Sequence, residues 1–528
     1  MSKVLDRLCA PGRKPVIEAS AIAQLPHRPP VVNLAFELEI CDKVTTNSKD
    51  GEKQSSSELR KIEFNERKAS RLSRIFDRVT GLAGTKYTFF LMLAALLIWA
   101  IVGGVTGATQ TWQIVIQDAS SIQCYISDTL LMRQQQNNSR NLLKLVCQLR
   151  SRNRTCKRLL QRVRQESING SEPSSPVQVN IDKDLVDAAD LPVENWYDRI
   201  CNYVVLAIGS LVSFVVYWAG IITWIALGPR LQWGNLWQLY INTATAVELT
   251  FTTVFLQNTR HRHTQYLEKC LQSIIKADNE MELRLRELTE DIDPNPTAII
   301  PPDVVTKGNR AIDYYGAIMG SGAGVVISVI VFAVWIGIGP TMQWNSNWWL
   351  IIGTYTGLVG FVDGYVLRND HFRANAFADV QLQTLADEEA VLCEMLGIPV
   401  LTETVAPTNS LHRRISQALG AFLSLPHAVL ASLVVVVTVI VIASCMHWSE
   451  TGQLICNTPT MIIEGFLLLV LIQAHHLSNE SRRIQFKGIL VRRLMINAQI
   501  ERLRVNSSKG TLHDTSASPV DGAESVVV

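Results

Sequence analysis

The sequence predicts an all-α, polytopic membrane protein with eight transmembrane helices, arranged as four repeated two-helix hairpins with cytoplasmic helical extensions. Three observations support this fold class: an internal repeat, long apolar stretches, and basic residues gathered on one side of those stretches. Apolar residues make up 48% of the chain and charged residues 18%, and the mean hydropathy is +0.15. This composition is typical of a membrane protein with large aqueous segments.

The repeat consists of a tryptophan near a predicted membrane edge, followed at fixed spacing by a polar helix. The tryptophans are Trp112, Trp233, Trp344 and Trp448; five residues later come Gln117, Gln238, Trp349 and Gln453, and four residues further Ser121, Asn242, Gly353 and Asn457. The stretches WIALGPRLQW and WIGIGPTMQW also match. Such self-similarity predicts one structural unit used four times. We expect pseudo-fourfold or paired-twofold symmetry, with the second helix of each unit inside.

Apolar stretches long enough to cross a hydrocarbon core of about 30 Å identify the spans. Five are clear, at Tyr87–Val105, Tyr203–Leu227, Gly316–Ile338, Ala428–Met446 and Met461–Ala474 with its preceding turn. Two more, Leu236–Leu256 and Trp348–Leu367, are interrupted by Thr, Gly and one acid each. Gln113–Met132 is too polar to be recognised by hydropathy, and only the repeat makes it the eighth span.

Basic residues indicate the orientation, because Lys and Arg concentrate on the cytoplasmic side of membrane proteins. The four short connections that carry the tryptophans contain one basic residue, Arg230, whereas the segments after each second helix are rich in Arg and Lys. Both termini are therefore predicted to be cytoplasmic. The basic segments have helical periodicity, so we expect each second helix to continue into the cytoplasm.

The chain divides at the composition changes between these segments. Residues 1–70 are predicted to be a disordered cytoplasmic N-terminus, because they are rich in Ser, Lys and Glu, and 506–528 are predicted to be a disordered tail. The predicted units are 71–165, 191–292, 308–400 and 401–505, with linkers at 166–190 and 293–307.

Each second helix carries a carboxylate inside the predicted membrane. Counted from Ser121, Asn242, Gly353 and Asn457, Asp128 and Glu464 lie at +7, Glu248 at +6 and Asp363 at +10, and Asp118 lies near the outer mouth. Helical geometry then places Asp128 and Glu464 at one depth. Intramembrane acids usually face a water-filled path or a bound cation. The alternative is that each acid is protonated or pairs with a neighbouring helix.

Oxygen and nitrogen ligands lie on both sides of these acids. The outer candidates are Asn242, Asn457, Thr245, Thr356 and Thr460, and the inner ones are His261, His371 and His475. Carboxylate and imidazole both suit Fe(II), Mn(II) and Zn(II), so the order of groups favours a path for a divalent transition metal. Helix packing is an alternative explanation of the threonines. The histidines could instead be polar groups at the membrane–water interface.

Several function classes lack their motifs. No nucleotide-binding loop, nucleophile triad or HExxH sequence is present, so we expect neither an enzyme nor a cofactor, and the charge pattern does not indicate nucleic-acid binding. A non-selective or monovalent cation channel is one alternative to metal uptake. A structural or regulatory membrane protein is another, although it would not need a carboxylate in every unit.

Several blocks closely resemble the fungal low-affinity iron permeases. They include WQIVIQDASSIQCYISDTLLMRQQQ, NWWLIIGTYTGLVGFVDGYVLR and TGQLICNTPTMIIEGFLLLVLIQAHH, and the resemblance covers about residues 70–500. It implies a multi-pass plasma-membrane protein, surrounded by lipid, for low-affinity uptake of Fe(II) and other divalent metals such as copper and zinc. No obligate ATPase or ferroxidase partner is implied, and homo-oligomerisation stays open. Asp118, Asp128, Asp363, Glu464 and His475 lie in the matching blocks, whereas the block around Glu248 matches less well.

Overall fold

The computed structural model describes residues 16–25, 71–107, 109–170, 196–399 and 411–514. Three kinds of helix recur there four times in the same order. Short collar helices come first: α3 (Arg71–Ala83), α7 (Trp196–Ile208), α10 (Lys307–Met319) and α13 (Leu411–Leu423). Apolar helices follow: α4 (Lys86–Thr106), α8 (Leu211–Leu227), α11 (Gly322–Ile338) and α14 (Pro426–Cys445). Long helices complete each set: α5 (Gln110–Gly170), α9 (Asn235–Thr289), α12 (Ser346–Met395) and α15 (Glu450–Asp514).

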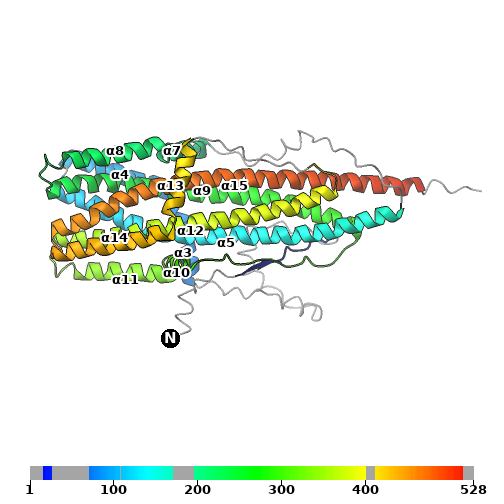
Figure 1. The fold of residues 1–528 in the computed structure, drawn as a ribbon, viewed down its shortest axis with the longest axis horizontal. Helices are drawn as coiled ribbons and strands as arrows, with labels where there is room; N and C mark the ends of the chain where they lie inside the picture. Colours follow the sequence, from blue (N-terminus) through cyan, green and yellow to red (C-terminus); the bar gives the residue numbers. More distant parts are fainter. Residues whose placement is uncertain (1–15, 26–70, 108, 171–195, 400–410, 515–528) are drawn as a thin grey trace, which may run out of the picture.

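The four long helices form a central bundle that runs the length of the molecule, and the apolar helices surround one half of it (Figure 1). Each long helix packs on two others, in the circular order α5, α9, α15, α12. Each apolar helix also packs on the next long helix in that order. Tyr217 of α8, for example, donates a hydrogen bond to the Ile462 carbonyl of α15 at 2.5 Å. Because each unit packs on the next in the same way, the four units have a pseudo-fourfold arrangement. The polar long helices lie inside it.

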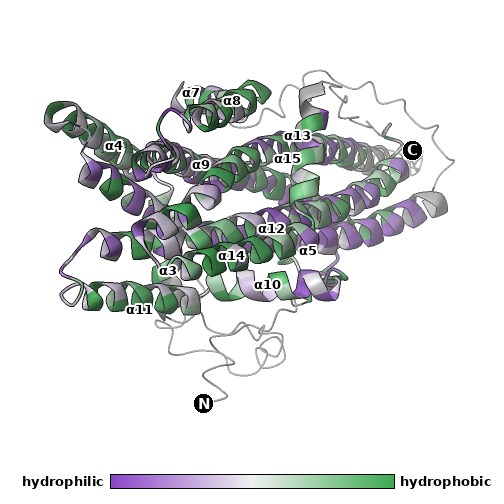
Figure 2. Cartoon of the chain, turned by 60° about the vertical axis from the view of Figure 1, so that its left-hand side comes forward, coloured by the Kyte–Doolittle hydropathy of each residue, from purple (hydrophilic) through white to green (hydrophobic). Residues whose placement is uncertain are grey.

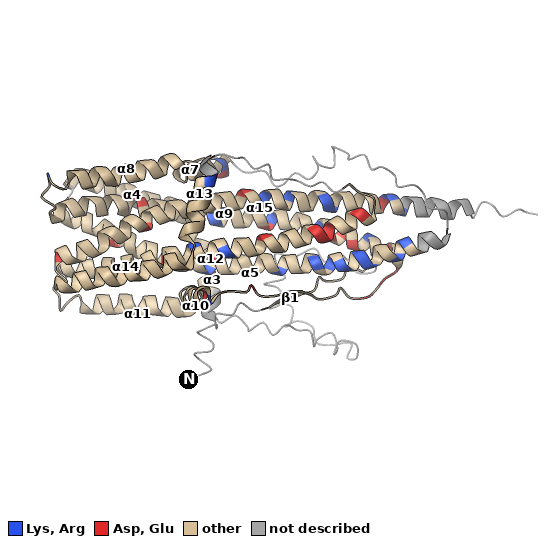
Figure 3. Ribbon diagram, viewed as in Figure 1, with Lys and Arg blue, Asp and Glu red and all other residues tan. Residues whose placement is uncertain are grey.

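Charge and hydropathy divide the molecule into two halves. Lys and Arg are nearly confined to the half of the bundle beyond the collar helices (Figure 3), and the apolar helices are mostly hydrophobic (Figure 2). Among the described residues, five helices are long and apolar enough to cross a membrane, and up to seven spans result if the bent pairs α7–α8 and α10–α11 each count as one. The chain is therefore an all-α, multi-pass membrane protein. Helix α5 is too polar to be among these spans, although it lies beside them in the bundle.

The collar helices lie across the bundle where the two halves meet (Figure 1). Hydroxyl caps end the turn between collar and apolar helix: Thr85, Ser210 and Ser321 each accept a hydrogen bond from a backbone N–H of the following first turn, which favours a helix start there. Ion pairs then join three collars to long helices: Asp77 to Arg133, Asp198 to Arg262 and Asp313 to Arg373.

Stacked tryptophans hold three apolar helices against their long helices and define which positions are equivalent. Trp112 stacks on Trp99, Trp237 on Trp224 and Trp348 on Trp335, at 4.0, 3.9 and 4.3 Å between ring centroids. In each pair both indole N–H groups donate to the partner's backbone carbonyl.

Trp112 is therefore equivalent to Trp237 and Trp348, and the alignment with Trp233 and Trp344 expected from the sequence is wrong by four residues. Trp448 does match Trp233 and Trp344, since all three donate their backbone N–H to the carbonyl five residues earlier. The fourth equivalent of Trp112 is thus Gly452.

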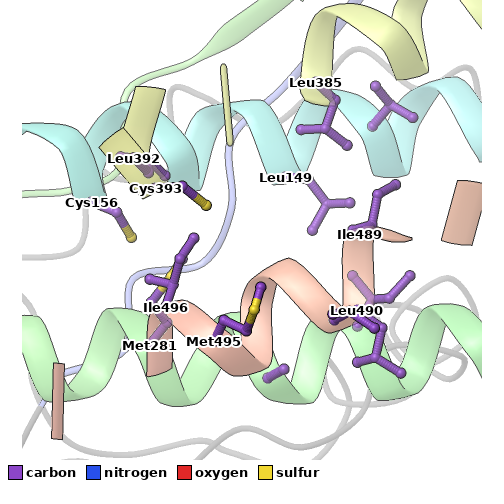
Figure 4. Close-up of a cluster of buried hydrophobic side chains, with 14 of the residues drawn as sticks. Leu149, Cys156, Met281, Leu385, Leu392, Cys393, Ile489, Leu490, Met495 and Ile496 are labelled. Carbon is purple, nitrogen blue, oxygen red and sulfur yellow. The ribbon is translucent and has the colours of Figure 1, made fainter. Parts of the chain in front are cut away.

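We call the half of the bundle beyond the collar helices the aqueous half. It has an apolar core made by all four long helices (Figure 4). Positions that are equivalent by the tryptophan alignment form layers in it. One layer is Leu149, Ile274, Leu385 and Ile489, and the next is Cys156, Met281, Leu392 and Ile496; each of these side chains is buried. The helical continuation beyond the membrane expected from the sequence is thus present as one four-helix core. Burial raises the pKa of the Cys156 thiol, so it packs as a neutral apolar group.

A buried ion cluster lies between those two layers. Arg493 contacts Asp278 at 2.7 Å and Glu389 at 3.2 Å, with all three side chains fully buried. Arg152 contacts Asp278 and Glu282, both at 2.8 Å. Burial acts to lower the pKa of Arg152, but the two carboxylates outweigh it and the pKa lies above its ordinary value.

The expected disorder of the N-terminus is wrong for a short segment. β1 (Ile17–Ala19) pairs antiparallel with β2 (Ala298–Ile300), inside the expected linker 293–307, because Ala19, Ala298 and Ile300 bury apolar side chains against the bundle core. Helices α5 and α15 also continue beyond the expected unit ends, to Gly170 and Asp514. Residues 1–15, 26–70, 171–195, 400–410 and 515–528 lie outside the described residues.

Candidate metal path

A layer of amide side chains opens the membrane half of the bundle. Five residues after Trp112 and its equivalents come Gln117, Asn242, Gly353 and Asn457, all on long helices. Gln117, Asn242 and Asn457 are almost fully buried. Oxygens of all three have no hydrogen-bond partner among the described residues. The two predicted asparagines, Asn242 and Asn457, therefore belong to one buried layer, and Gln117 is its third amide.

The carboxylates follow this layer at different depths. Glu464 is seven residues after Asn457 and Glu248 six after Asn242, whereas Asp128 is eleven after Gln117 and Asp363 ten after Gly353. Asp128 thus lies about 6 Å deeper than Glu464, from four residues at ~1.5 Å rise. The expected common depth of Asp128 and Glu464 is wrong, because it depended on the shifted alignment. The levels are instead Glu464 with Glu248, and Asp128 with Asp363.

Asp118 lies one residue inside the amide layer, near the end of the bundle at which the long helices begin, and is 2% exposed. The Asp118 carboxylate fits there because α12 has a glycine opposite it. A Cβ added to Gly353 would be 2.6 Å from Asp118 Oδ1. The same holds deeper in the bundle. A Cβ would be 2.5 Å from Asn457 Oδ1 at Gly357, 2.8 Å from Glu464 Oε1 at Gly360, and 2.3 Å from Glu248 Oε2 at Gly465. Glycines therefore leave the room that the polar side chains occupy.

Electrostatic interactions link the deeper acids. Asp128, Asp363 and Glu464 lie close enough together to repel one another, and Arg368 is the cation that offsets them. The Arg368 guanidinium is fully buried and donates one bond, to the Gly364 carbonyl at 2.5 Å. Its Nε and Nη2 have no partner among the described residues. A guanidinium with free donors beside repelling carboxylates can stabilise them until a cation arrives.

Only two of these acids accept a hydrogen bond in the described part of the chain. Asp363 accepts one from Tyr315 of the collar helix α10 at 2.6 Å, and Glu248 accepts one from Thr252 at 3.0 Å. The second oxygen of each, and Oδ2 of Asp118, have no partner there. Buried oxygens without a partner destabilise the folded state unless water or a cation binds them.

The threonine candidates donate to carbonyls of their own helix. Thr245 donates to Ile241, Thr356 to Ile352 and Thr460 to Asn457, at 2.9, 2.7 and 2.8 Å. This local bonding favours the helix-packing interpretation of their hydroxyls. Their oxygens keep lone pairs, so coordination stays a prediction.

The histidine candidates separate into two groups. His371 and His475 lie together, with ring centroids 3.9 Å apart, farther along the long helices than the carboxylates. His261 instead packs against Gly84 at the edge of the bundle and bonds to Gln265, because its helix position faces outward. Among the described residues, no three His, Cys, Asp or Glu side chains are grouped so that they could hold one metal ion. The acidic groups are distributed along the axis rather than gathered at one centre.

Three residues near the acids were not identified from the sequence. These are Arg368, Tyr315 and Cys124. Cys124 is the α5 equivalent of Glu464, and its thiol lies within electrostatic reach of Glu464 and Asp128. The repeat itself, correctly aligned, was the signal that could have identified Cys124.

The sequence matches a known family of membrane proteins. A model of the low affinity iron permease family matches residues 72–166, 197–293, 309–405 and 412–505. The chain belongs to the low affinity iron permease family. One relative of this permease is the low-affinity iron/zinc ion transport protein fet4 of Schizosaccharomyces pombe, 48% identical over 94% of this chain and 85% of that protein. Another is the low-affinity Fe(2+) transport protein of Saccharomyces cerevisiae, 36% identical over 95% of this chain and 98% of that protein. No solved structure matches. The family consists of membrane transporters, so this permease is not an enzyme.

The glycine at position 360 gives a first test of the permease. Gly360→Ala should lower Fe(II) uptake at least several-fold, because the new methyl group would displace the Glu464 carboxylate that lies 2.8 Å from its Cβ position. Radioactive iron uptake per molecule at the cell surface measures this. Gly337→Ala is the control, since no atom lies within 4 Å of a Cβ there. Equal loss in both variants would contradict the proposed contact.

Proposed function

We propose that this permease carries Fe(II) inward across the plasma membrane, with low affinity, along the axis of α5, α9, α12 and α15. The observation that supports it best is the distribution of charge: each long helix contributes a carboxylate to a half that otherwise holds almost no charge, and these carboxylates are buried except for the half-buried Glu248. Asp128, Glu248, Asp363 and Glu464 are those carboxylates. Family membership and the names of both relatives support the same substrate.

The proposed topology has eight spans and cytoplasmic termini. Its supports are the position of α5 between α9 and α12 in the bundle and the basic residues in the half beyond the collars. That half would then be the cytoplasmic one. The polar spans need no lipid contact, because the apolar helices surround them.

The proposed path begins at Asp118 and the amide layer and continues through two carboxylate levels about 6 Å apart. At each level the ion would exchange part of its water shell for carboxylate oxygens. The guanidinium of Arg368 would then no longer be needed to offset the charge of those carboxylates. Since no level gathers a full ligand set, each would bind weakly, and weak sites permit release as well as capture. The apolar layers and the ion cluster block the axis of the aqueous half, so the ion would leave sideways near His371 and His475.

Zinc is the second proposed substrate. The relative in Schizosaccharomyces pombe is named for iron and zinc, and mixed carboxylate and imidazole ligands suit both metals. Copper stays a further candidate.

The decisive experiment measures metal uptake by cells that lack their own iron uptake systems and express this permease. We expect saturable Fe(II) uptake that zinc inhibits. Copper and manganese would be compared at equal concentration. A current of Na⁺ or K⁺ without iron uptake would instead support the monovalent channel, and neither signal would support a structural role.

Uptake should also depend on the membrane potential, since the sequence has no nucleotide-binding motif. A divalent ion gains about 4.6 kcal/mol per 100 mV, twice the ~2.3 kcal/mol of a single charge. Collapse of the potential at an unchanged metal gradient should therefore lower initial uptake strongly. Full uptake without a potential would contradict inward movement down the electrochemical gradient.

A further inference from the structure

Four aliphatic side chains meet just outside the amide layer. Ile114, Leu239, Leu350 and Leu454 are each two residues after Trp112 or its equivalent, one on each long helix. Together they form a separate hydrophobic cluster, with only Trp349 packed against it. Their exposed fractions are 4, 2, 3 and 0%. We call them the outer ring.

The outer ring lies on the route that the proposed path must take. It precedes Gln117 and Asn457 by three residues, or about 4.5 Å along the helices, and it is near the first turn of each long helix. Among the described residues, no other layer of the path has an aliphatic residue from all four helices so close to the outer end. A layer of four aliphatic side chains excludes water, and an ion cannot keep its water shell while crossing it.

Packing alone would be the simpler explanation of such a layer, as it is for Leu149, Ile274, Leu385 and Ile489 in the aqueous half. The surroundings argue otherwise. The outer ring is flanked by buried amides, including Gln238 and Gln453, rather than by further apolar layers. A second equivalent set lies on the inner side of the acids: Leu131, Leu256, Leu367 and Leu471, all buried. The acidic segment is thus enclosed by aliphatic residues at both ends.

We propose that the outer ring is a hydrophobic gate that closes the permease to the outside and must part to admit each metal ion. This inference rests on the proposed function, because it assumes that the path follows the bundle axis. In the structure the gate is closed. Ile114, Leu239, Leu350 and Leu454 would then limit the rate of entry, and the carboxylates behind them would select the ion.

The test labels a cysteine behind the ring. Ser121→Cys places a thiol one turn inside the amide layer, at a side chain that is 4% exposed. The background carries Cys445→Ser, because Cys445 is the exposed cysteine among those described, and the labelling of this background without Ser121→Cys is subtracted to account for Cys124 behind the ring. A cationic, membrane-impermeant methanethiosulfonate is applied from outside. Leu350→Ala should speed labelling of Ser121→Cys at least about tenfold, the factor for a barrier lower by about 1.4 kcal/mol. The control is Leu385→Ala, the same change at the packing layer of the aqueous half, which should leave labelling unchanged.

Each outcome decides something. Faster labelling with Leu350→Ala, and not with Leu385→Ala, supports the gate even if iron uptake is absent, so failure of the proposed function would be seen separately. Equal labelling rates in the parent and in Leu350→Ala would overturn the gate. If Leu350→Ala does not reach the membrane, Leu454→Ala tests the same ring. A Na⁺ leak in the alanine variants is expected as a second readout, because a wider, wetter ring no longer excludes small cations.

Discussion

Asp128→Asn and Glu464→Gln should each reduce Fe(II) uptake by at least about tenfold, while the protein still reaches the cell surface. Each change keeps the side-chain volume and removes one charge from a buried position. A carboxylate attracts a divalent ion at 4 Å by several kcal/mol even at an effective dielectric constant of about 20. A tenfold change in rate requires only ~1.4 kcal/mol. Initial rates of radioactive iron uptake, divided by the amount of surface protein, measure the effect.

The two carboxylate levels make the double variants informative. Asp128→Asn combined with Asp363→Asn removes one level, whereas Asp128→Asn combined with Glu464→Gln weakens both. Residues that share a level act on the same bound ion, so their effects should add less completely than those of residues on separate levels. Glu248→Gln should cost less than Glu464→Gln, because Thr252 already bonds to Glu248.

The control for these variants is Glu388→Gln, in the aqueous half. Glu388 pairs with Arg150 at 2.9 Å at a partly exposed position, so its change should be nearly silent in uptake. Asp182, the other cytoplasmic control suggested by the sequence, lies outside the described residues. Normal transport by both Asp128→Asn and Glu464→Gln would show that these acids are structural.

The repeat could be recognised from the sequence, but its alignment could not. The second and third units each offer more than one tryptophan before the polar helix, such as Trp233 and Trp237, whereas the fourth unit has Trp448 alone. The polar helix that follows has few other landmarks. A shift of four residues is about one helical turn, so it keeps nearly the same face inward. Amphipathic patterning therefore cannot distinguish Trp112 matched with Trp233 from Trp112 matched with Trp237. The stacked indole pairs, which join residues 13 apart in sequence, decide it.

The site was partly predictable for a similar reason. Acids inside apolar stretches stand out, since charge there is costly, and Asp128, Asp363 and Glu464 do lie near one another. Partners from other helices have no such signal. Gly360 gives no hint in the sequence that it makes room for Glu464, and His261 and His371 read alike although one faces outward.

The aqueous half shows the same limit. Arg152, Asp278, Glu389 and Arg493 each look like solvated charges on a cytoplasmic helix, as surface charges usually are. Only the meeting of four distant segments turns them into one buried cluster.

Arg493→Met should destabilise the protein by about 3–5 kcal/mol, the usual cost of breaking a buried ion pair from one side. Methionine fills much of the space, but Asp278 and Glu389 would be left as buried carboxylates without their shared cation. Glu389 would keep Arg492, at 2.7 Å, and Asp278 would keep Arg152, at 2.8 Å. Neither remaining arginine joins the two acids, so α12 would lose its link to α9. Thermal unfolding of the purified protein in detergent should show a lower midpoint.

The matched control is Arg504→Met, in the exposed pair that Arg504 forms with Glu287 at 3.4 Å. Surface pairs contribute about 0–1 kcal/mol, so its melting midpoint should hardly change. Uptake per folded Arg493→Met molecule should stay near that of the parent at low temperature, because Arg493 is 25 residue positions beyond the Asp128 level, or about 37 Å along the bundle. A melting midpoint equal to that of the parent would mean that neighbouring arginines or water replace Arg493. A selective loss of uptake in well-folded Arg493→Met would instead make the aqueous half part of the transport cycle.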